Sequence, residues 1–172
     1  MSEKIAFNDR EVFFDEDDVI VSKTDLKGAL TYVNKVFISV SGFKEAELIG
    51  KPHSVIRHPD MPRCIFKLLW ETIVDGREIF AYVKNATKSG GFYWVLAHVT
   101  PSKDAAGQIV GFHSNRRVPN RKSVSQISEL YRELRAIEQR GDRRQSLESS
   151  YQQLMSVIER QKMSYDEMIH NI

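Results

Sequence analysis

Arg57-His58-Pro59-Asp60-Met61-Pro62 is the most informative stretch of this sequence. Proline fixes φ and biases the preceding residue toward extended geometry, so the two prolines make the segment stiff. One fixed positive charge, one histidine and one carboxylate are therefore held in a set relation to one another, directly before a helical pattern. A stiff loop that carries these polar groups is typical of a segment that contacts a ligand.

The pattern after this loop predicts an amphipathic helix that ends at Gly76. Its apolar residues recur at helical spacing: Ile65, Leu69 and Ile73, with Phe66 and Trp70 one residue round. Pro62 suits the first turn, where a missing N–H costs little. Asp60 is suited either to cap this helix or to contact a ligand, and the sequence leaves both readings open.

The rest of the first 120 residues indicates an α+β domain. A β-hairpin pattern occupies 19–33, and short helical segments follow from Asn34. Three strands joined by glycine-containing turns are predicted at 79–85, 91–101 and 109–118. These elements predict a five-stranded antiparallel sheet with the helices on one face. The space between sheet and helices is a natural cavity for a small ligand.

The C-terminal segment, 121–172, has a helical pattern of its own. A heptad seam spaced 4-3-4-3-4-3-4 runs to the last residue and consists of Leu147, Tyr151, Leu154, Ile158, Gln161, Tyr165, Met168 and Ile172. Upstream of the seam, Gly141 suits a helix end and Asp142 a helix cap. We therefore expect two helices, as a hairpin or a kinked long helix. The seam favours a coiled coil with a second copy or a partner, and packing on its own domain is the alternative.

Composition limits the classes of function. The 172 residues contain 41% apolar residues and 25 basic against 23 acidic side chains, without a basic stripe, so nucleic-acid binding is not expected. The single Cys64 excludes an internal disulfide and multi-cysteine metal sites. No apolar stretch approaches the roughly 20 residues that span a bilayer. We expect a cytoplasmic protein that reaches the inner membrane only through a partner, with an arm at 1–17, a sensor domain at 18–120 and a helical segment at 121–172.

Several short motifs between Asp18 and Arg117 carry a resemblance to a known family. They are Ser22–Leu26, Asn34-x-x-Phe37, Val40–Phe43, Leu48–His53, Val83–Asn85, Tyr93–Val95 and the opening stretch. Together they resemble a PAS domain, and they are most similar to the PAS domains of bacterial aerotaxis and energy-taxis receptors of the Aer type. The opening stretch is the most specific of these motifs.

The resemblance implies a PAS fold that binds FAD without a covalent bond and reports the redox state of the respiratory chain. The site residues that it implies are Asn34, Arg57, His58, Asp60, Phe66 and Asn85, and we add His53 and Trp70 as candidates beside them. The side-chain chemistry suits such a site, since an amide can pair with the edge of the flavin ring and aromatic rings can wall it. For Asn34, hydrogen bonding to nearby backbone is an equal alternative. Cys64 lacks the Asn-Cys-Arg-type context of photoactive flavin domains.

The resemblance also implies a signalling partner, namely a membrane-bound chemoreceptor or its HAMP and signalling region. We expect a homo-oligomer formed through the N-terminal arm and the C-terminal helices, and no enzymatic activity. The chief alternative is a cofactor-free PAS module for dimerisation or partner binding. The sequence leaves open whether the chain is a stand-alone, CetB-like protein or a fragment of a receptor.

Overall fold

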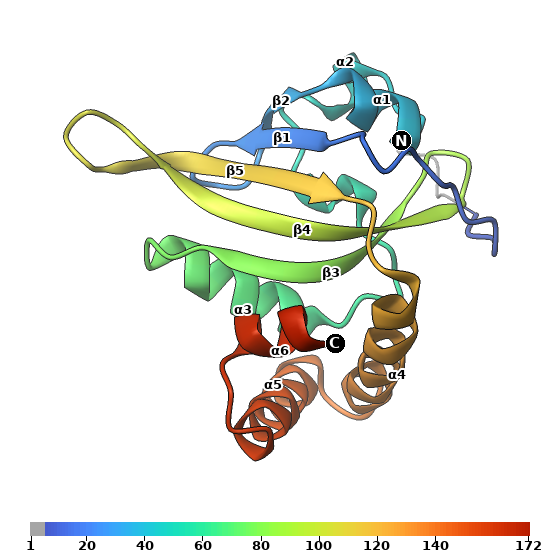
Figure 1. The fold of residues 1–172 in the computed structure, drawn as a ribbon, viewed down its shortest axis with the longest axis vertical. Coiled ribbons are helices and arrows are strands. Elements are labelled where there is room, and N and C mark those ends of the chain that lie inside the picture. The colour runs from blue at the N-terminus through green and yellow to red at the C-terminus, as the bar shows by residue number, and fades with distance from the viewer. Residues whose placement is uncertain (1–5) are drawn as a thin grey trace.

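The computed structural model describes residues 6–172 and confirms the predicted five-stranded antiparallel sheet (Figure 1). The strand order is β2-β1-β5-β4-β3. The strands are β1 (Ile20–Thr24), β2 (Leu30–Val33), β3 (Ile79–Ala86), β4 (Phe92–Lys103) and β5 (Ile109–Arg117). The first hairpin therefore joins the second half of the sheet through β5, which lies at its centre. β3 forms one edge.

The helices between β2 and β3 cover one face of this sheet. They are α1 (Lys35–Ser41), α2 (Glu45–Leu48), the 3-10 turn η1 (His53–Ile56) and α3 (Arg63–Val74). Asn34 caps α1 through its side-chain oxygen, and Gly42 ends α1 with φ at 73°. α3 packs against β3 and β4. The stiff 57–62 loop connects η1 to the start of α3.

Three helices follow the sheet, where two were predicted. They are α4 (Arg121–Glu138), α5 (Arg143–Arg160) and α6 (Tyr165–Asn171), and Figure 1 shows them grouped with α3 near β3. α4 and α5 form the hairpin that Gly141 and Asp142 indicated: Gly141 has φ at 72°, and Asp142 caps α5.

The prediction of a continuous heptad seam is wrong. α5 ends at Arg160, Lys162 adopts a positive φ of 54°, and Ser164 begins α6 with a capping box to Glu167. Four seam residues are buried, namely Leu154, Ile158, Tyr165 and Met168, whereas Gln161 at the break is exposed. The second half of the seam therefore packs on its own domain, which was the alternative to a coiled coil.

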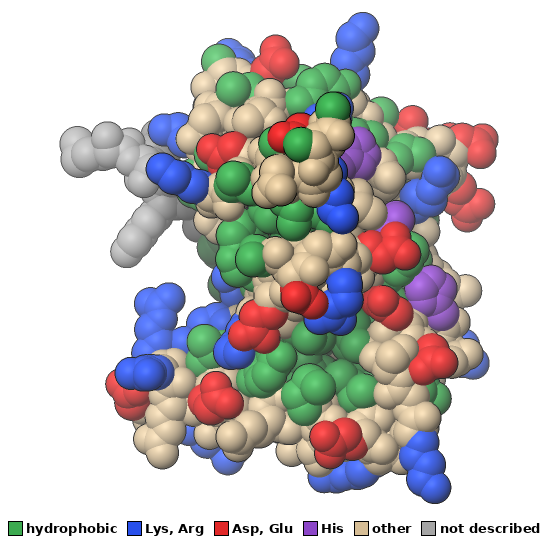
Figure 2. Space-filling view, turned by 90° about the vertical axis from the view of Figure 1, so that its left-hand side faces the viewer, with side chains coloured by type: hydrophobic (Ala, Val, Ile, Leu, Met, Phe, Trp, Pro, Cys, Tyr) green, Lys and Arg blue, Asp and Glu red, His purple; other side chains and the backbone are tan. Residues whose placement is uncertain are grey.

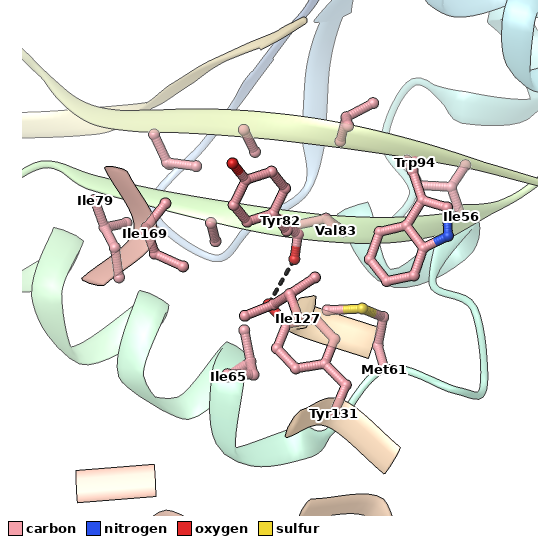
Figure 3. Packing of buried hydrophobic residues seen from close by; sticks show 14 of the residues in the cluster. Ile56, Met61, Ile65, Ile79, Tyr82, Val83, Trp94, Ile127, Tyr131 and Ile169 are labelled. Atoms are coloured by element: carbon pink, nitrogen blue, oxygen red, sulfur yellow. Dashed lines mark hydrogen bonds between the residues drawn. The ribbon is translucent and has the colours of Figure 1, made fainter. Parts of the chain in front are cut away.

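The C-terminal helices cover the β3 edge of the sheet, beside α3. The Tyr131 hydroxyl of α4 donates to the Tyr82 carbonyl of β3 at 2.7 Å, and the Tyr131 ring lies beside Trp94 (Figure 3). Asp166 of α6 accepts from the Phe80 amide at 3.1 Å. Edge strands expose unpaired backbone groups, and these two contacts occupy such groups on β3.

The described part of the N-terminal arm packs on its own domain. The Asn8 amide donates to Gly90, the Val12 amide to Phe92, and Glu11 pairs with Arg121 of α4. The described residues of both segments that the sequence assigned to self-association thus make contacts within the chain, and self-association stays a prediction. Residues 1–5 of the predicted arm lie outside the described residues.

Within residues 6–172, no helix is both long and apolar enough to cross a membrane. Figure 2 shows one face of the molecule, on which acidic and basic side chains are interspersed rather than gathered by sign.

Candidate functional site

A cavity of about 380 Å³ lies between the sheet and α3, where the sequence predicted one. We call it the sheet–helix cavity. Its sheet wall comes from β1, β3, β4 and β5, its helix wall from the apolar face of α3, and its rim from the first hairpin turn and η1. The volume lies at the lower end of the roughly 300–1,000 Å³ typical of small-molecule sites.

Five of the eight predicted site residues line this cavity: His53, Arg57, Phe66, Trp70 and Asn85. The Arg57 backbone pairs with Asn85 of β3 in an isolated bridge, and the Arg57 guanidinium lies 4.0 Å from the centre of the Phe66 ring. Trp70 stays 41% exposed at the rim, tilted against Phe112 at 5.3 Å. The 57–62 loop therefore contributes its first residue to the cavity wall.

Asn34 lies outside the lining of the cavity, and both the oxygen and the nitrogen of its side-chain amide bind backbone groups. Its side-chain oxygen accepts from the amides of Val21 and Phe37, and its Nδ2 donates to the Val19 carbonyl at 2.7 Å. These bonds tie the start of α1 to β1. Asn34 therefore binds nearby backbone, which is the alternative to a ligand contact that the sequence left open.

His58 and Asp60 also lie outside the cavity lining. His58 is buried between the rings of Phe7 and Phe92, and its Nδ1 accepts from the Asp60 amide at 3.1 Å. Burial, followed by the charge of Lys84, lowers the pKa of His58 to about 4, so it is neutral at pH 7.

Asp60 does not cap α3, which corrects one of its two suggested roles. Its carboxylate accepts from Lys84 Nζ at 2.6 Å and stays largely exposed. The cap position of α3 is Pro62, and the free amides of the first turn are bound by Glu138, from the end of α4. A contact across this sequence distance was not visible in the local pattern.

Arg116 is the cavity residue that the sequence analysis missed. It lies on the central strand β5, is only 2% exposed, and donates from Nη2 to Ser22 Oγ and, at 2.6 Å, to His53 Nε2. Burial and then the Arg116 charge lower the pKa of His53 to about 3, so His53 is a neutral acceptor. Burial lowers the pKa of Arg116 to about 10, which still leaves it charged at pH 7.

Two buried donors of the cavity wall lack a partner among the described residues: Asn85 Nδ2 and Arg116 Nη1. Arg116 also has no carboxylate partner within that part of the chain. Buried polar groups are normally hydrogen-bonded, and an unpaired buried charge is costly. An apolar cavity with an unpaired amide and a cation therefore fits a largely apolar ligand whose edge carries acceptor atoms and negative charge.

Cys64 does not line the cavity. It is 0% exposed on α3, and its backbone amide donates to Glu138. Burial raises the pKa of its thiol to about 12, so the reactive thiolate is absent at pH 7.

Comparison with known proteins agrees with this geometry. The curated "Aerotaxis receptor" of Escherichia coli (strain K12) is 37% identical over 121 residues, which is 70% of this chain and 24% of the relative's length. The light-state structure of the blue-light photoreceptor Aureochrome1 LOV has a TM-score of 0.57 at 18% identity, covering 64% of this chain and 88% of that chain.

A light-oxygen-voltage domain studied with a flavin analogue has a TM-score of 0.57 at 14% identity and covers 64% of this chain and 83% of that chain. At such identities the solved structures show a shared fold. The family model described as the PAS fold matches residues 30–116. This chain therefore belongs to the PAS-fold family.

Proposed function

We propose that this chain is an FAD-binding redox sensor of aerotaxis, which passes a conformational change to a chemoreceptor-type partner. The observation that carries the proposal is the pair of unpartnered buried donors, Arg116 Nη1 and Asn85 Nδ2, in the wall of an apolar cavity. Similarity to an aerotaxis receptor supports the sensory role, and the shared fold with a domain studied with a flavin analogue supports the ligand class.

The residues present fit a flavin. Its ring system is flat and apolar, with donors and acceptors along one edge, and when bound it supplies a redox group whose charge changes on reduction. The Asn85 amide is suited to the ring edge, and Phe66 and Trp70 offer aromatic surface to the ring faces. Arg116 supplies a fixed positive charge, while neutral His53 orients it.

Signalling requires that the cavity distinguish two redox states. A ligand shifts a conformational equilibrium only by its differential affinity for the two states. Arg116 provides that difference, because a cation without a carboxylate partner interacts more strongly with an added negative charge than with a neutral ligand. Since β5 joins the two halves of the sheet, a change at Arg116 reaches β1 through Ser22 and η1 through His53.

Adduct-forming photochemistry is not part of the proposal. The cysteine of this chain is buried against Glu138 rather than in the cavity lining. We therefore expect the visible absorbance of a flavin-loaded sample to be unchanged by blue light, apart from ordinary photoreduction.

The test is the absorbance spectrum of the purified full chain, followed by release of the bound molecule with heat and its identification by chromatography. We expect the two visible flavin bands and release of FAD. Release of FMN would keep the flavin sensor but overturn the choice of FAD. A colourless protein that takes up neither FAD nor FMN would favour the cofactor-free PAS interaction module.

A further inference from the structure

The hairpin of α4 and α5 is held on α3 by a buried carboxylate. The Glu138 side chain is 0% exposed and accepts four hydrogen bonds. Two come from the backbone amides of Arg63 and Cys64, at 2.8 and 2.9 Å, and two from Arg63 Nε and Ser150 Oγ, at 3.2 and 2.9 Å. Three helices thus meet at one ionised group: the end of α4, the start of α3 and the first half of α5.

The side chain of Arg63, at the start of α3, makes further hydrogen bonds to the α4–α5 hairpin. Its guanidinium donates to the backbone carbonyls of Glu138 and Arg143, at 3.3 and 2.9 Å, and to Ser146 Oγ at 3.0 Å. These acceptors lie at the end of α4 and in the first turn of α5. Arg63 therefore binds the hairpin close to its turn. We call the Arg63–Glu138 pair with these bonds the latch.

The latch and the sheet–helix cavity share α3. The first two residues of α3 bind Glu138, while Phe66, Leu69, Trp70 and Ile73 of the same helix line the cavity. Arg57 lines the cavity and stacks on Phe66, and the short 57–62 loop connects it to Arg63, the first residue of α3. Burial lowers the pKa of Arg57, the Glu138 carboxylate raises it, and Arg135, Arg63 and Arg143 lower it. Arg57 is therefore within electrostatic reach of the latch.

We propose that the latch is a releasable contact, and that negative charge gained in the sheet–helix cavity weakens it by drawing Arg57 toward the cavity. The α4–α5 hairpin is then the output arm, free to meet a partner when released. The source of the charge, a reduced flavin, rests on the proposed function, whereas the latch and its electrostatic link to Arg57 do not. Such release is a two-state change biased from a distant site.

The first experiment measures backbone hydrogen exchange of the full, cofactor-free chain by mass spectrometry. Glu138→Gln removes the negative charge and keeps the side-chain size, and Glu133→Gln on the exposed face of α4 is the matched control. We expect exchange in 143–160 to rise about tenfold to a hundredfold in Glu138→Gln, the order expected for lost charge-assisted hydrogen bonds. The control should match the unmodified chain.

Tryptic cleavage in the exposed turn provides a second readout of the same release. Arg140, Arg143 and Arg144 are exposed there, and cleavage of a transiently opened segment follows the population of its open form. We expect faster cleavage in Glu138→Gln with β3 to β5 still protected from exchange. Equal exchange and cleavage in Glu138→Gln and Glu133→Gln would overturn the latch.

The second experiment tests the link to the cavity without any cofactor. Arg57→Met removes the positive charge of this cavity residue, and Arg57→Lys keeps it. We expect exchange in 143–160 to rise about threefold in Arg57→Met, the order expected for loss of a partly exposed charge partner, and to stay near the unmodified rate in Arg57→Lys. Unchanged exchange in Arg57→Met would leave the latch in place but overturn its control by the cavity.

A flavin-loaded sample then separates this inference from the proposed function. We expect faster exchange in 143–160 after reduction than before it. A loaded protein with equal exchange in both states would overturn charge-driven release even though the flavin is present. A protein that binds no flavin, yet shows both variant effects, would overturn the proposed function and retain the latch.

Discussion

Replacing Arg116 by Met should weaken flavin binding while leaving the cofactor-free protein at least as stable. The reason lies in what the change leaves behind. Ser22 Oγ and His53 Nε2, which both accept from Arg116, lie 3.2 Å apart, so the Ser22 hydroxyl can donate to His53 once Arg116 is gone. No buried acceptor is then orphaned, and an unpaired buried charge is removed. Methionine fills a similar volume without that charge.

The magnitudes follow from the same contacts. Replacing a buried ion pair by apolar residues of similar volume is often neutral or stabilising by about 1–4 kcal/mol, and Arg116 has no carboxylate partner to lose among the described residues. A hydrogen bond to a charged group contributes about 1.5–3 kcal/mol, which corresponds to roughly 10- to 150-fold in affinity. We therefore expect FAD to bind about 10- to 150-fold more weakly, while the free energy of unfolding without FAD is unchanged or higher.

Two measurements on the full chain check this prediction. Urea unfolding of the cofactor-free protein gives the change in stability, and titration with FAD, followed by flavin fluorescence, gives the affinity. Arg117→Met is the matched control, because Arg117 is the next residue on β5 and is exposed. A loss of several kcal/mol of stability in Arg116→Met would mean that Arg116 is structural. Unchanged FAD affinity would refute its role in the site.

Two further predictions follow from contacts outside the cavity. Asn34→Ala should lower the free energy of unfolding, measured by urea unfolding, by about 2 kcal/mol, because the cap of α1 is lost and the Val19 carbonyl is left unpaired. The affinity for FAD should stay unchanged, and a large loss of affinity would show that Asn34 belongs to the site. For Glu138, burial raises the pKa, but bonds from the Arg63 and Cys64 amides, Ser150 and the Arg63 side chain lower it overall from 4.5. The unfolded chain then binds protons first. The contribution of Glu138 to stability is therefore full above pH 4.5 and is lost as the pH falls through the lower pKa of the folded state. The positive charges of Arg135 and Arg57 oppose protonation of Glu138. Exchange in 143–160 should rise over that acid range, and a Glu138→Gln chain with the same acid step would contradict the assignment.

Most of the fold could be predicted from local sequence patterns. Alternating strands, glycine turns and the helical stripe of α3 predicted the sheet and the position of the cavity, because each depends on neighbours a few residues away. The break between α5 and α6 was also readable. Ser164 followed by Glu167 is a capping box, which marks a helix start, but the heptad spacing runs through it without interruption.

The site was only partly predictable. Aromatic residues of α3 lie on a face that periodicity reveals, so Phe66 and Trp70 were placed in the cavity lining. Arg116 has the same strand parity as Phe112 and Ser114, two other cavity residues. That parity was the available signal, but charged residues are seldom buried without a partner. The roles of Asp60 and Glu138 depend on Lys84 and Arg63, contacts between distant segments that no local pattern encodes.

The reduction potential of the bound flavin tests the central claim most directly. If reduction strengthens one charge-assisted contact of the flavin by about 1.5–3 kcal/mol, the potential shifts by on the order of 65–130 mV for a one-electron couple. Stabilising the reduced form raises the potential. Spectroelectrochemical titration of the purified chain should therefore give a potential about 65–130 mV more positive than that of free FAD under the same conditions. A potential equal to or below that of free FAD would contradict the account.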